Sequence, residues 1–296
     1  MHTASSATRS TGQQWTVLSL LQSATQHLSE RGFEEARLHV ELLLAHVLHC
    51  SRLQLYTNYD RPLSADELAT FKAFLKRRLA REPLQYILGT TEFMGIPLRV
   101  DRRVLIPRPE TEQLVERAVH ILGTMSKPRP EVLDIGTGSG NISIAIAKFA
   151  PQCVVTAIDV SSEALAVAQE NAATNNIHTV TFVQADVFDD FLPHEQFDMI
   201  ISNPPYISAD EFVLLAPEIR EFEPRIATTD EVDGLKVIRR IAQVAQTKLY
   251  SGGHLLLEIA YNQGEAASEI LRQAGLNGVE VYADHAGHPR IVCARK

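Results

Sequence analysis

The sequence Glu131-Val-Leu-Asp-Ile-Gly-Thr-Gly-Ser-Gly140 gives the strongest indication of the architecture. Its first five residues form a short apolar run typical of a buried strand, and residues 141–149 continue with apolar residues at helical spacing. The glycines between them permit a tight turn in which the backbone can approach another group closely. A strand that passes through a glycine loop directly into a helix is typical of an α/β sheet.

The remainder of the chain continues this alternation. A helix is predicted after Ser161, with Leu165, Ala168 and Ala172 on its inner face, and another around residues 235–245. Alternation of this kind predicts a mostly parallel sheet with helices on both faces. The predicted strands are Glu131–Ile135, Val154–Asp159, Val180–Gln184, Phe197–Ser202, His254–Ile259, Val279–Ala283 and Ile291–Ala294.

The N-terminal part has a different pattern. Residues 14–82 contain three amphipathic helical segments, the third opened by a capping box at Ser64, and are predicted to form a small helical bundle that positions a substrate. Residues 83–106 are predicted to be a linker with a β-hairpin: the stretch Tyr86–Gly89 and then Thr91–Val100 is predicted to form two short strands around a turn at Gly95. Residues 107–296 then form the sheet domain, with Pro109 at its first helix start, and residues 1–13 a flexible tail.

Composition excludes several classes of function. The formal net charge of -8 over 296 residues argues against unselective binding to nucleic acid, which depends on neutralising phosphates. The 3 cysteines are far apart and lack CxxC spacing, so we expect neither a disulfide framework nor a metal site. No apolar run is long enough to span a membrane, and residues 1–13 lack the apolar core of a secretory signal. We therefore expect a cytoplasmic protein.

The glycine loop differs from a dinucleotide fingerprint. GxGxxG would require glycine at position 141, where Asn141 stands, whereas GxGxG after an acid resembles the signature of S-adenosylmethionine binding. Asp134 would attract the ammonium of that ligand and would repel a pyrophosphate. The loop residues predicted to bind the cofactor are Asp134, Gly136, Thr137, Gly138, Ser139 and Gly140.

Acids also follow the next two predicted strands. Asp159 is placed to accept both hydroxyls of a ribose, and Asp186 can accept from the amino group of an adenine whose ring lies against Val187. Because ligands of open α/β sheets bind at the carboxyl ends of the strands, these acids and the glycine loop predict a nucleoside site.

A rigid polar group follows the strand at residues 197–202. In Asn203-Pro204-Pro205-Tyr206 each proline fixes its own φ, and each residue before a proline is restricted to extended geometry. An amide side chain, a carbonyl and an aromatic ring are therefore held in fixed directions where the strand meets a loop.

In this order, these motifs resemble a class I methyltransferase of the NPPY type. Ile106–Glu112 (IPRPETE), Pro83–Gly89 (PLQYILG) and the helical N-terminal part make the chain similar to the HemK-like peptide chain release factor glutamine N5-methyltransferases. The resemblance implies a seven-stranded sheet with one antiparallel strand, and methyl transfer from S-adenosylmethionine to the glutamine amide in the GGQ motif of class I release factors. It also leads us to expect a monomer without a direct nucleic acid or membrane partner.

The resemblance further implies roles for the tetrapeptide. The Asn203 side-chain oxygen and the Pro204 carbonyl would accept the two amide hydrogens of the substrate, with Asn203 also next to the cofactor. Tyr206 would pack on the flat amide and Pro205 would stiffen the wall of the site.

Two alternatives remain open from the residues alone. The same tetrapeptide suits methylation of an exocyclic amine of nucleic acid, such as adenine N6, and a cofactor-binding assembly factor without catalysis is a second possibility. Residues 206–235 are predicted to be irregular and carry eight acids against Arg220 and Arg225. This acidic segment is either a solvated loop or a lid that meets a basic protein loop.

Overall fold

The computed structural model describes residues 14–189 and 196–296. The tail predicted for residues 1–13 lies outside the described residues. By its internal contacts the chain divides into two compact units, the first ending at Leu88 and the second spanning Gly89–Lys296. Among the described helices, none is both long and apolar enough to cross a membrane.

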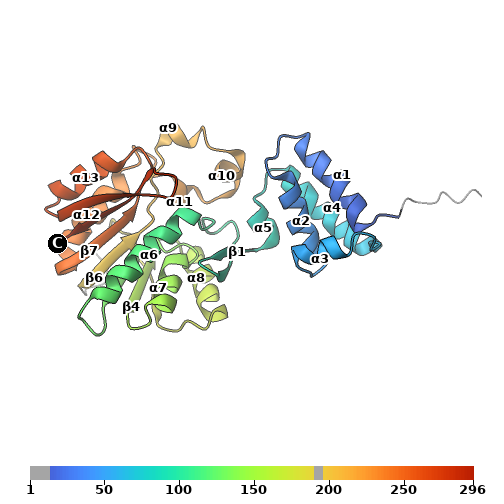
Figure 1. Ribbon diagram of the computed structural model, residues 1–296. Helices are drawn as coiled ribbons and strands as arrows, with labels where there is room; N and C mark the ends of the chain where they lie inside the picture. Colours follow the sequence, from blue (N-terminus) through green and yellow to red (C-terminus); the bar gives the residue numbers. More distant parts are fainter. Residues whose placement is uncertain (1–13, 190–195) are drawn as a thin grey trace, which may run out of the picture. The chain divides into compact units, whose positions relative to one another are not determined.

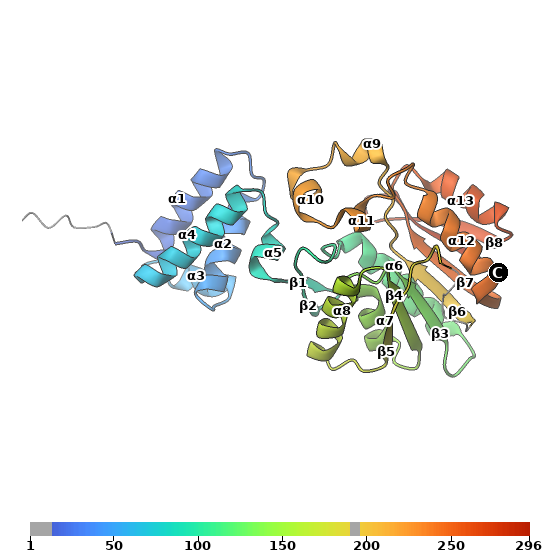
Figure 2. The same cartoon turned by 180° about the vertical axis from the view of Figure 1, so that it is seen from behind.

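The first unit is a helical bundle (Figure 2). Helix α2 packs against α1, α3 and α4, and side-chain capping boxes at Thr16, Ser51 and Ser64 begin α1, α3 and α4. Helix α3 was not predicted, because its 6 residues are too few to establish a period. The helices are α1 (Val17–Ser29), α2 (Ala36–Val47), α3 (Arg52–Thr57), α4 (Ala65–Leu79) and α5 (Leu84–Leu88).

The strand predicted at residues 86–89 is wrong, because most of this segment belongs to helix α5. Leu84 and Ile87 lie three positions apart and are both buried in the core of the bundle, as helical spacing requires.

The hairpin follows as β1 (Thr90–Phe93) and β2 (Ile96–Arg99). Its turn at Gly95 is confirmed: Met94 and Gly95 have φ of 51° and 71°, as a tight two-residue hairpin turn demands.

The second unit is built on a seven-stranded sheet of order β5-β4-β3-β6-β7-β9-β8 (Figure 1). The strands from β5 to β7 are parallel, and β9 runs antiparallel to both β7 and β8, which confirms the predicted mostly parallel sheet with an antiparallel strand at the chain end. The strands are β3 (Glu131–Ile135), β4 (Val154–Asp159), β5 (Val180–Gln184), β6 (Phe197–Ser202), β7 (Leu249–Glu258), β8 (Asn277–Ala283) and β9 (Pro289–Arg295).

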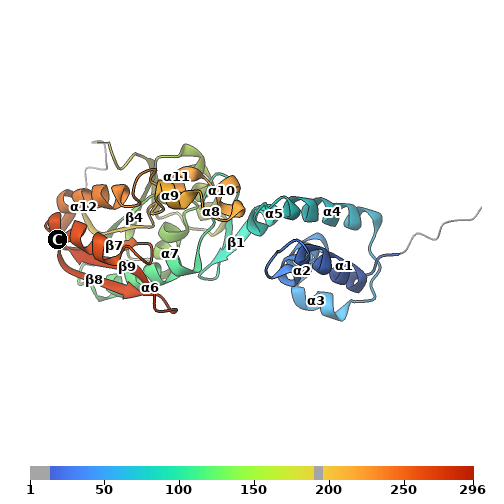
Figure 3. The same ribbon diagram turned by 90° about the horizontal axis from the view of Figure 1, so that it is seen from above.

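Helices cover both faces of this sheet (Figures 1 and 3). Val132 of β3 and Met199 of β6 face the core formed with α6, α7 and the hairpin, whereas the next residues, Leu133 and Ile200, face the core formed with α12 and α13. This alternation follows from the two-residue period of a strand and explains why apolar residues occupy consecutive positions in the central strands. The helices are α6 (Pro109–Thr124), α7 (Asn141–Phe149), α8 (Ser162–Thr174), α12 (Lys236–Lys248) and α13 (Gly264–Gln273).

Three differences from the predicted elements concern the second half of the chain. Strand β7 begins five residues before His254, because a register shift between the pairs Phe197–Leu249 and Met199–His254 allows Leu249 to pair with Phe197. Helix α13 was not predicted. Residues 206–235, predicted to be irregular, contain the short helices α9 (Ala209–Phe212), α10 (Pro217–Phe222) and α11 (Arg225–Thr228).

We expect Gly140→Ala to destabilise the second unit by about 2 to 4 kcal/mol. Gly140 has φ of 82°, and an added Cβ would lie 2.9 Å from Ile144 Cδ1 and 3.1 Å from Ala168 Cβ. The matched control is Gly123→Ala in α6, where no atom lies within 4 Å of the added Cβ and alanine should stabilise by up to about 1 kcal/mol. Urea unfolding followed by circular dichroism measures both changes, while emission of the sole tryptophan, Trp15, reports the first unit and should not move. Equal midpoints for the two variants would contradict this.

Candidate functional site

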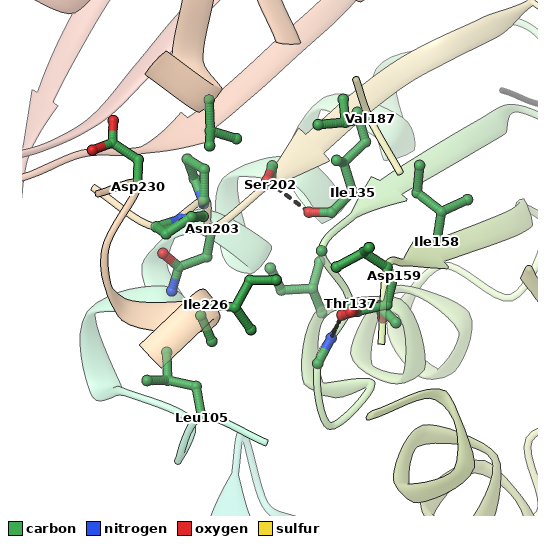
Figure 4. A pocket seen from close by; sticks show the side chains of 18 of the residues that line it. Leu105, Ile135, Thr137, Ile158, Asp159, Val187, Ser202, Asn203, Ile226 and Asp230 are labelled. Carbon is green, nitrogen blue, oxygen red and sulfur yellow. Dashed lines mark hydrogen bonds between the residues drawn. The ribbon is translucent and has the colours of Figure 1, made fainter. Parts of the chain in front are cut away.

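A cavity of about 600 Å³ lies at the carboxyl ends of the parallel strands in the second unit. In Figure 4, Asn203 and Ile226 lie on one side of it, and Thr137 and Asp159 on the other. The glycine loop after β3, the ends of β4 to β6 and helix α11 all contribute to its walls. Of the predicted site residues, those that line it are Gly136, Thr137, Gly138, Ser139, Asp159, Asp186, Val187, Asn203, Pro204 and Pro205.

Asp134 does not line this cavity, because it is fully buried beneath the glycine loop. Its Oδ2 accepts a 2.6 Å hydrogen bond from Thr137 Oγ1, which also lies 2.9 Å from Ser143 Oγ. Burial raises the pKa of Asp134 to about 7, against the lowering effect of the Thr137 hydrogen bond. Asp134 therefore supports the glycine loop through Thr137, and its direct contact with a ligand ammonium stays a prediction.

Two buried oxygens near the loop make no hydrogen bond to any described residue. They are Oδ1 of Asp134 and Oγ of Ser139, and Ser139 also lines the cavity. A buried polar atom without a partner is costly, so Ser139 Oγ indicates a ligand or water with polar groups at this end of the cavity. Gly140, the last glycine of the loop, instead forms the N-cap of α7.

Asp159 and Asp186 lie at the ends of β4 and β5, as predicted. Asp159 accepts from the backbone N–H of Gly138 at 2.8 Å and of Ser161 at 2.9 Å, and burial raises its pKa. Each of its oxygens therefore keeps one lone pair for a further donor. Asp186 accepts from the Phe188 N–H at 2.9 Å, and Val187 between them is buried against the cavity.

The backbone around Asn203–Tyr206 is fixed at both ends. Before it, Ser202 Oγ donates a 2.7 Å hydrogen bond to the Ile135 carbonyl of the neighbouring strand. After it, Gln263 Nε2 donates to the Tyr206 carbonyl at 2.9 Å. Among the described residues, no hydrogen bond uses the Pro204 carbonyl, so this acceptor is available to a ligand.

The Asn203 side chain belongs to a buried polar chain. Its Nδ2 donates to Thr111 Oγ1 at 3.1 Å, Thr111 Oγ1 donates to Glu258 Oε2 at 2.6 Å, and Tyr206 Oη donates to Glu258 Oε1 at 3.3 Å. Sequence reasoning missed Thr111 and Glu258. The available signal was the charge of Glu258 directly after the apolar run Leu255–Leu257, because buried acids are rare unless they are paired.

A second cavity, of about 100 Å³, lies on another side of the tetrapeptide. Asn203 and Pro204 line both cavities, and Tyr206 lines only the smaller one. Leu215 and Ile219, from the segment between α9 and α10 and from α10, complete the apolar wall of the smaller cavity. Asn203 and Pro204 therefore border both cavities.

Arg108, from the motif before α6, holds the segment of residues 206–235 against this site. Its Nη2 lies 2.7 Å from both carboxylate oxygens of Glu223, whose side chain is buried. Burial raises the pKa of Glu223, and the guanidinium opposes that effect. Arg108 also lines both cavities.

Most acids of this segment have partners within the protein, so its charge is a weaker argument for a basic partner than the sequence suggests. Glu211 caps α9, and Asp230 accepts from three backbone N–H groups, those of Val232, Gly234 and Lys236. The acids that form ion pairs, with their partners, are Glu221–Arg220, Glu223–Arg108, Glu231–Arg225 and Asp233–Arg239.

The arrangement suits group transfer to a neutral NH₂ group. The large cavity presents the acids Asp159 and Asp186 and the unpaired Ser139 Oγ, groups of the kind that bind a nucleoside carrying charged groups. At its border two fixed acceptors, Asn203 Oδ1 and the Pro204 carbonyl, can orient a planar amide or amine.

Comparisons with known proteins agree on a methyltransferase. Residues 19–89 match the family model described as the PrmC N-terminal domain, and residues 115–218 match the methyltransferase small domain. A release factor glutamine methyltransferase of Rhodopirellula baltica is 41% identical over 286 residues, 95% of this chain and 97% of that protein. Another, of Geobacter sulfurreducens, is 40% identical over 281 residues, 95% of this chain and 97% of that protein.

A solved methyltransferase from Pyrococcus furiosus shares the fold. The TM-score is 0.52 at 20% identity, and the match covers 75% of this chain and 98% of that one.

We expect Asp134→Asn to make the stability of the second unit less dependent on pH between about 4 and 7. Burial raises the pKa of Asp134 from 3.8 to about 7 in the folded protein. The stability that the protonated Asp134 carboxyl contributes is therefore fully present below the unfolded-state pKa of 3.8 and is lost as pH rises through the folded-state pKa of about 7. This loss amounts to up to about 4 kcal/mol. Urea unfolding at a series of pH values measures the slope, part of which remains because burial also raises the pKa of Glu258. A slope as steep as in the wild type would contradict this.

Proposed function

The chain belongs to the release factor glutamine methyltransferase family, and on that premise we propose that its site methylates N5 of the glutamine in the GGQ motif of class I peptide chain release factors, with S-adenosylmethionine as donor. The observation that carries the proposal is the pair of free acceptors, Asn203 Oδ1 and the Pro204 carbonyl, at the border of a cavity with nucleoside-binding character.

The residues of the large cavity fit S-adenosylmethionine. Its amino acid part carries an ammonium and a carboxylate, which suit the end where Ser139 Oγ is buried without a partner beside the glycine loop. The remaining lone pairs of Asp159 suit the ribose hydroxyls, and Asp186 with Val187 suits the adenine. When bound, the cofactor supplies an electrophilic methyl group on a sulfonium.

The protein's contribution to the chemistry is to orient the substrate amide. Its nitrogen is a poor nucleophile, because the lone pair is delocalised into the carbonyl. Asn203 Oδ1 and the Pro204 carbonyl accept its two hydrogens, which directs the nitrogen toward the large cavity and stabilises the positive charge that develops on it. Tyr206 packs on the flat amide and Pro205 stiffens the wall of the site, and the proton leaves to water after transfer.

We expect labelled S-adenosylmethionine to transfer its methyl group to the GGQ glutamine of a class I release factor and not to DNA or RNA. Peptide mapping after incubation with each acceptor locates the label. Label on an exocyclic amine of nucleic acid, and none on the glutamine, would favour the alternative that uses the same tetrapeptide.

We expect Asn203→Ala to lower kcat by about 10²- to 10³-fold while cofactor binding persists, because one of two preorganised acceptors is lost. Single-turnover rates and calorimetric titration with S-adenosylmethionine measure the two quantities. The matched control is Asn277→Ala at the exposed start of β8, which should leave both unchanged. Unaltered turnover by Asn203→Ala would refute the role given to its amide.

A further inference from the structure

The buried polar chain from Asn203 to Glu258 joins four side chains from three parts of the fold. Thr111 lies in the first turn of α6, Glu258 ends β7, and Asn203 and Tyr206 follow β6. Thr111 is 0% exposed and Glu258 is 1% exposed, so water does not compete for these hydrogen bonds. Their directions are therefore decided by the donors and acceptors within the chain.

When Glu258 is ionised, the protons of this hydrogen-bonded chain can be arranged in only one way. A carboxylate only accepts, so the single hydroxyl proton of Thr111 points to Glu258 at 2.6 Å. The Thr111 oxygen then offers only lone pairs toward Asn203, and it must receive an N–H of Nδ2 at 3.1 Å. This fixes which end of the Asn203 amide faces α6 and leaves Oδ1 without a partner among the described residues.

We propose that Glu258 and Thr111 are positioning residues, which lock the Asn203 amide in the orientation that presents its oxygen to the substrate nitrogen. The proposal rests on the proposed function, because the acceptor role of Asn203 gives the orientation its purpose. An amide turned by 180° would present its NH₂ group to the substrate NH₂ group, and two donors cannot bond to each other. Tyr206, through its own bond to Glu258, is held by the same carboxylate.

A protonated Glu258 would release this lock. It could donate its proton to Thr111 Oγ1, which frees the Thr111 hydroxyl to point at Asn203 and permits the turned amide. Burial raises the pKa of Glu258 to about 7, and nearby Glu110 adds to that effect. The hydrogen bonds from Thr111 and Tyr206 and the charge of Arg290 oppose it. Because the ionised form is the locked one, the rate should fall as pH drops through this range.

The first test separates positioning from packing. Thr111→Val keeps the shape and removes the hydroxyl, and it should lower kcat by about 10²-fold with the KM for the release factor unchanged. Thr111→Ser restores a hydroxyl and should recover most of the rate. A wild-type kcat in Thr111→Val, or equal losses in the valine and serine variants, would overturn the proposal.

The second test uses the pH profile of kcat. The wild type should lose rate below about pH 7, and Glu258→Gln, which cannot ionise, should show a low rate without that acidic limb. Because burial also raises the pKa of Asp134 to about 7, Asp134→Asn is the matched control and should keep the limb. A limb that survives in Glu258→Gln and disappears in Asp134→Asn would assign it to the glycine loop and overturn this part of the proposal.

The third test does not depend on activity. The protein is prepared without cofactor and labelled with ¹⁵N-asparagine, and the side-chain NH₂ resonance of Asn203 is assigned by its absence from the spectrum of Asn203→Ala. This resonance should shift with pH near 7 in the wild type and should not shift in Glu258→Gln. A resonance that does not titrate in the wild type would overturn the proposal. If the wild-type protein shows this titration but methylates no release factor, the proposed function is wrong and the positioning of Asn203 by Glu258 still holds.

Discussion

The parallel pairing of β3 with β6 is the constraint on which the site depends. It places Ile135 opposite Ser202, and the Ser202 hydroxyl closes the junction with a 2.7 Å hydrogen bond to the Ile135 carbonyl. The glycine loop and the Asn203 tetrapeptide leave these two strands at the same edge, although more than sixty residues separate them in sequence. Both strands are buried between helices on both faces, so the distance between the two halves of the site is as rigid as the core itself.

This rigidity coexists with buried charge. Asp134 under the glycine loop and Glu258 at the end of β7 are both acids whose pKa burial raises to about 7, and each would be easier to bury as an apolar residue. Both make their strongest hydrogen bond to a threonine, Thr137 or Thr111, at 2.6 Å. The same arrangement thus appears on both sides of the site: a buried acid accepts a short hydrogen bond from the hydroxyl of a threonine that lines the large cavity. Sites of this kind are expected to reduce stability in return for a defined geometry.

The sequence predicted what depends on local pattern and missed what depends on contact between distant segments. Strands β3 to β6 have the predicted bounds, because their apolar runs end at clear loop signals, whereas the helical spacing of Leu84 and Ile87 was overlooked at α5. Ten of the predicted site residues line the large cavity, since motifs at strand ends meet at one edge. Thr111 and Glu258 were not predicted, because their pairing spans 147 positions and no local spacing records it. The acids of residues 206–235 were counted correctly, but their internal partners emerged only from the fold.

One consequence of the hydrogen bond from Asn203 to Thr111 concerns the enzyme itself. A protein that methylates primary amides carries a primary amide of its own at the border of the cavity, where a hydrogen bond to Thr111 holds it. The bond at 3.1 Å keeps Nδ2 against α6, so the oxygen and not the nitrogen is the atom left for the reaction space. The contact that makes Asn203 an acceptor for the substrate would therefore also turn its own nitrogen away from the methyl donor. Of two similar amide nitrogens, only that of the substrate would then be directed into the large cavity.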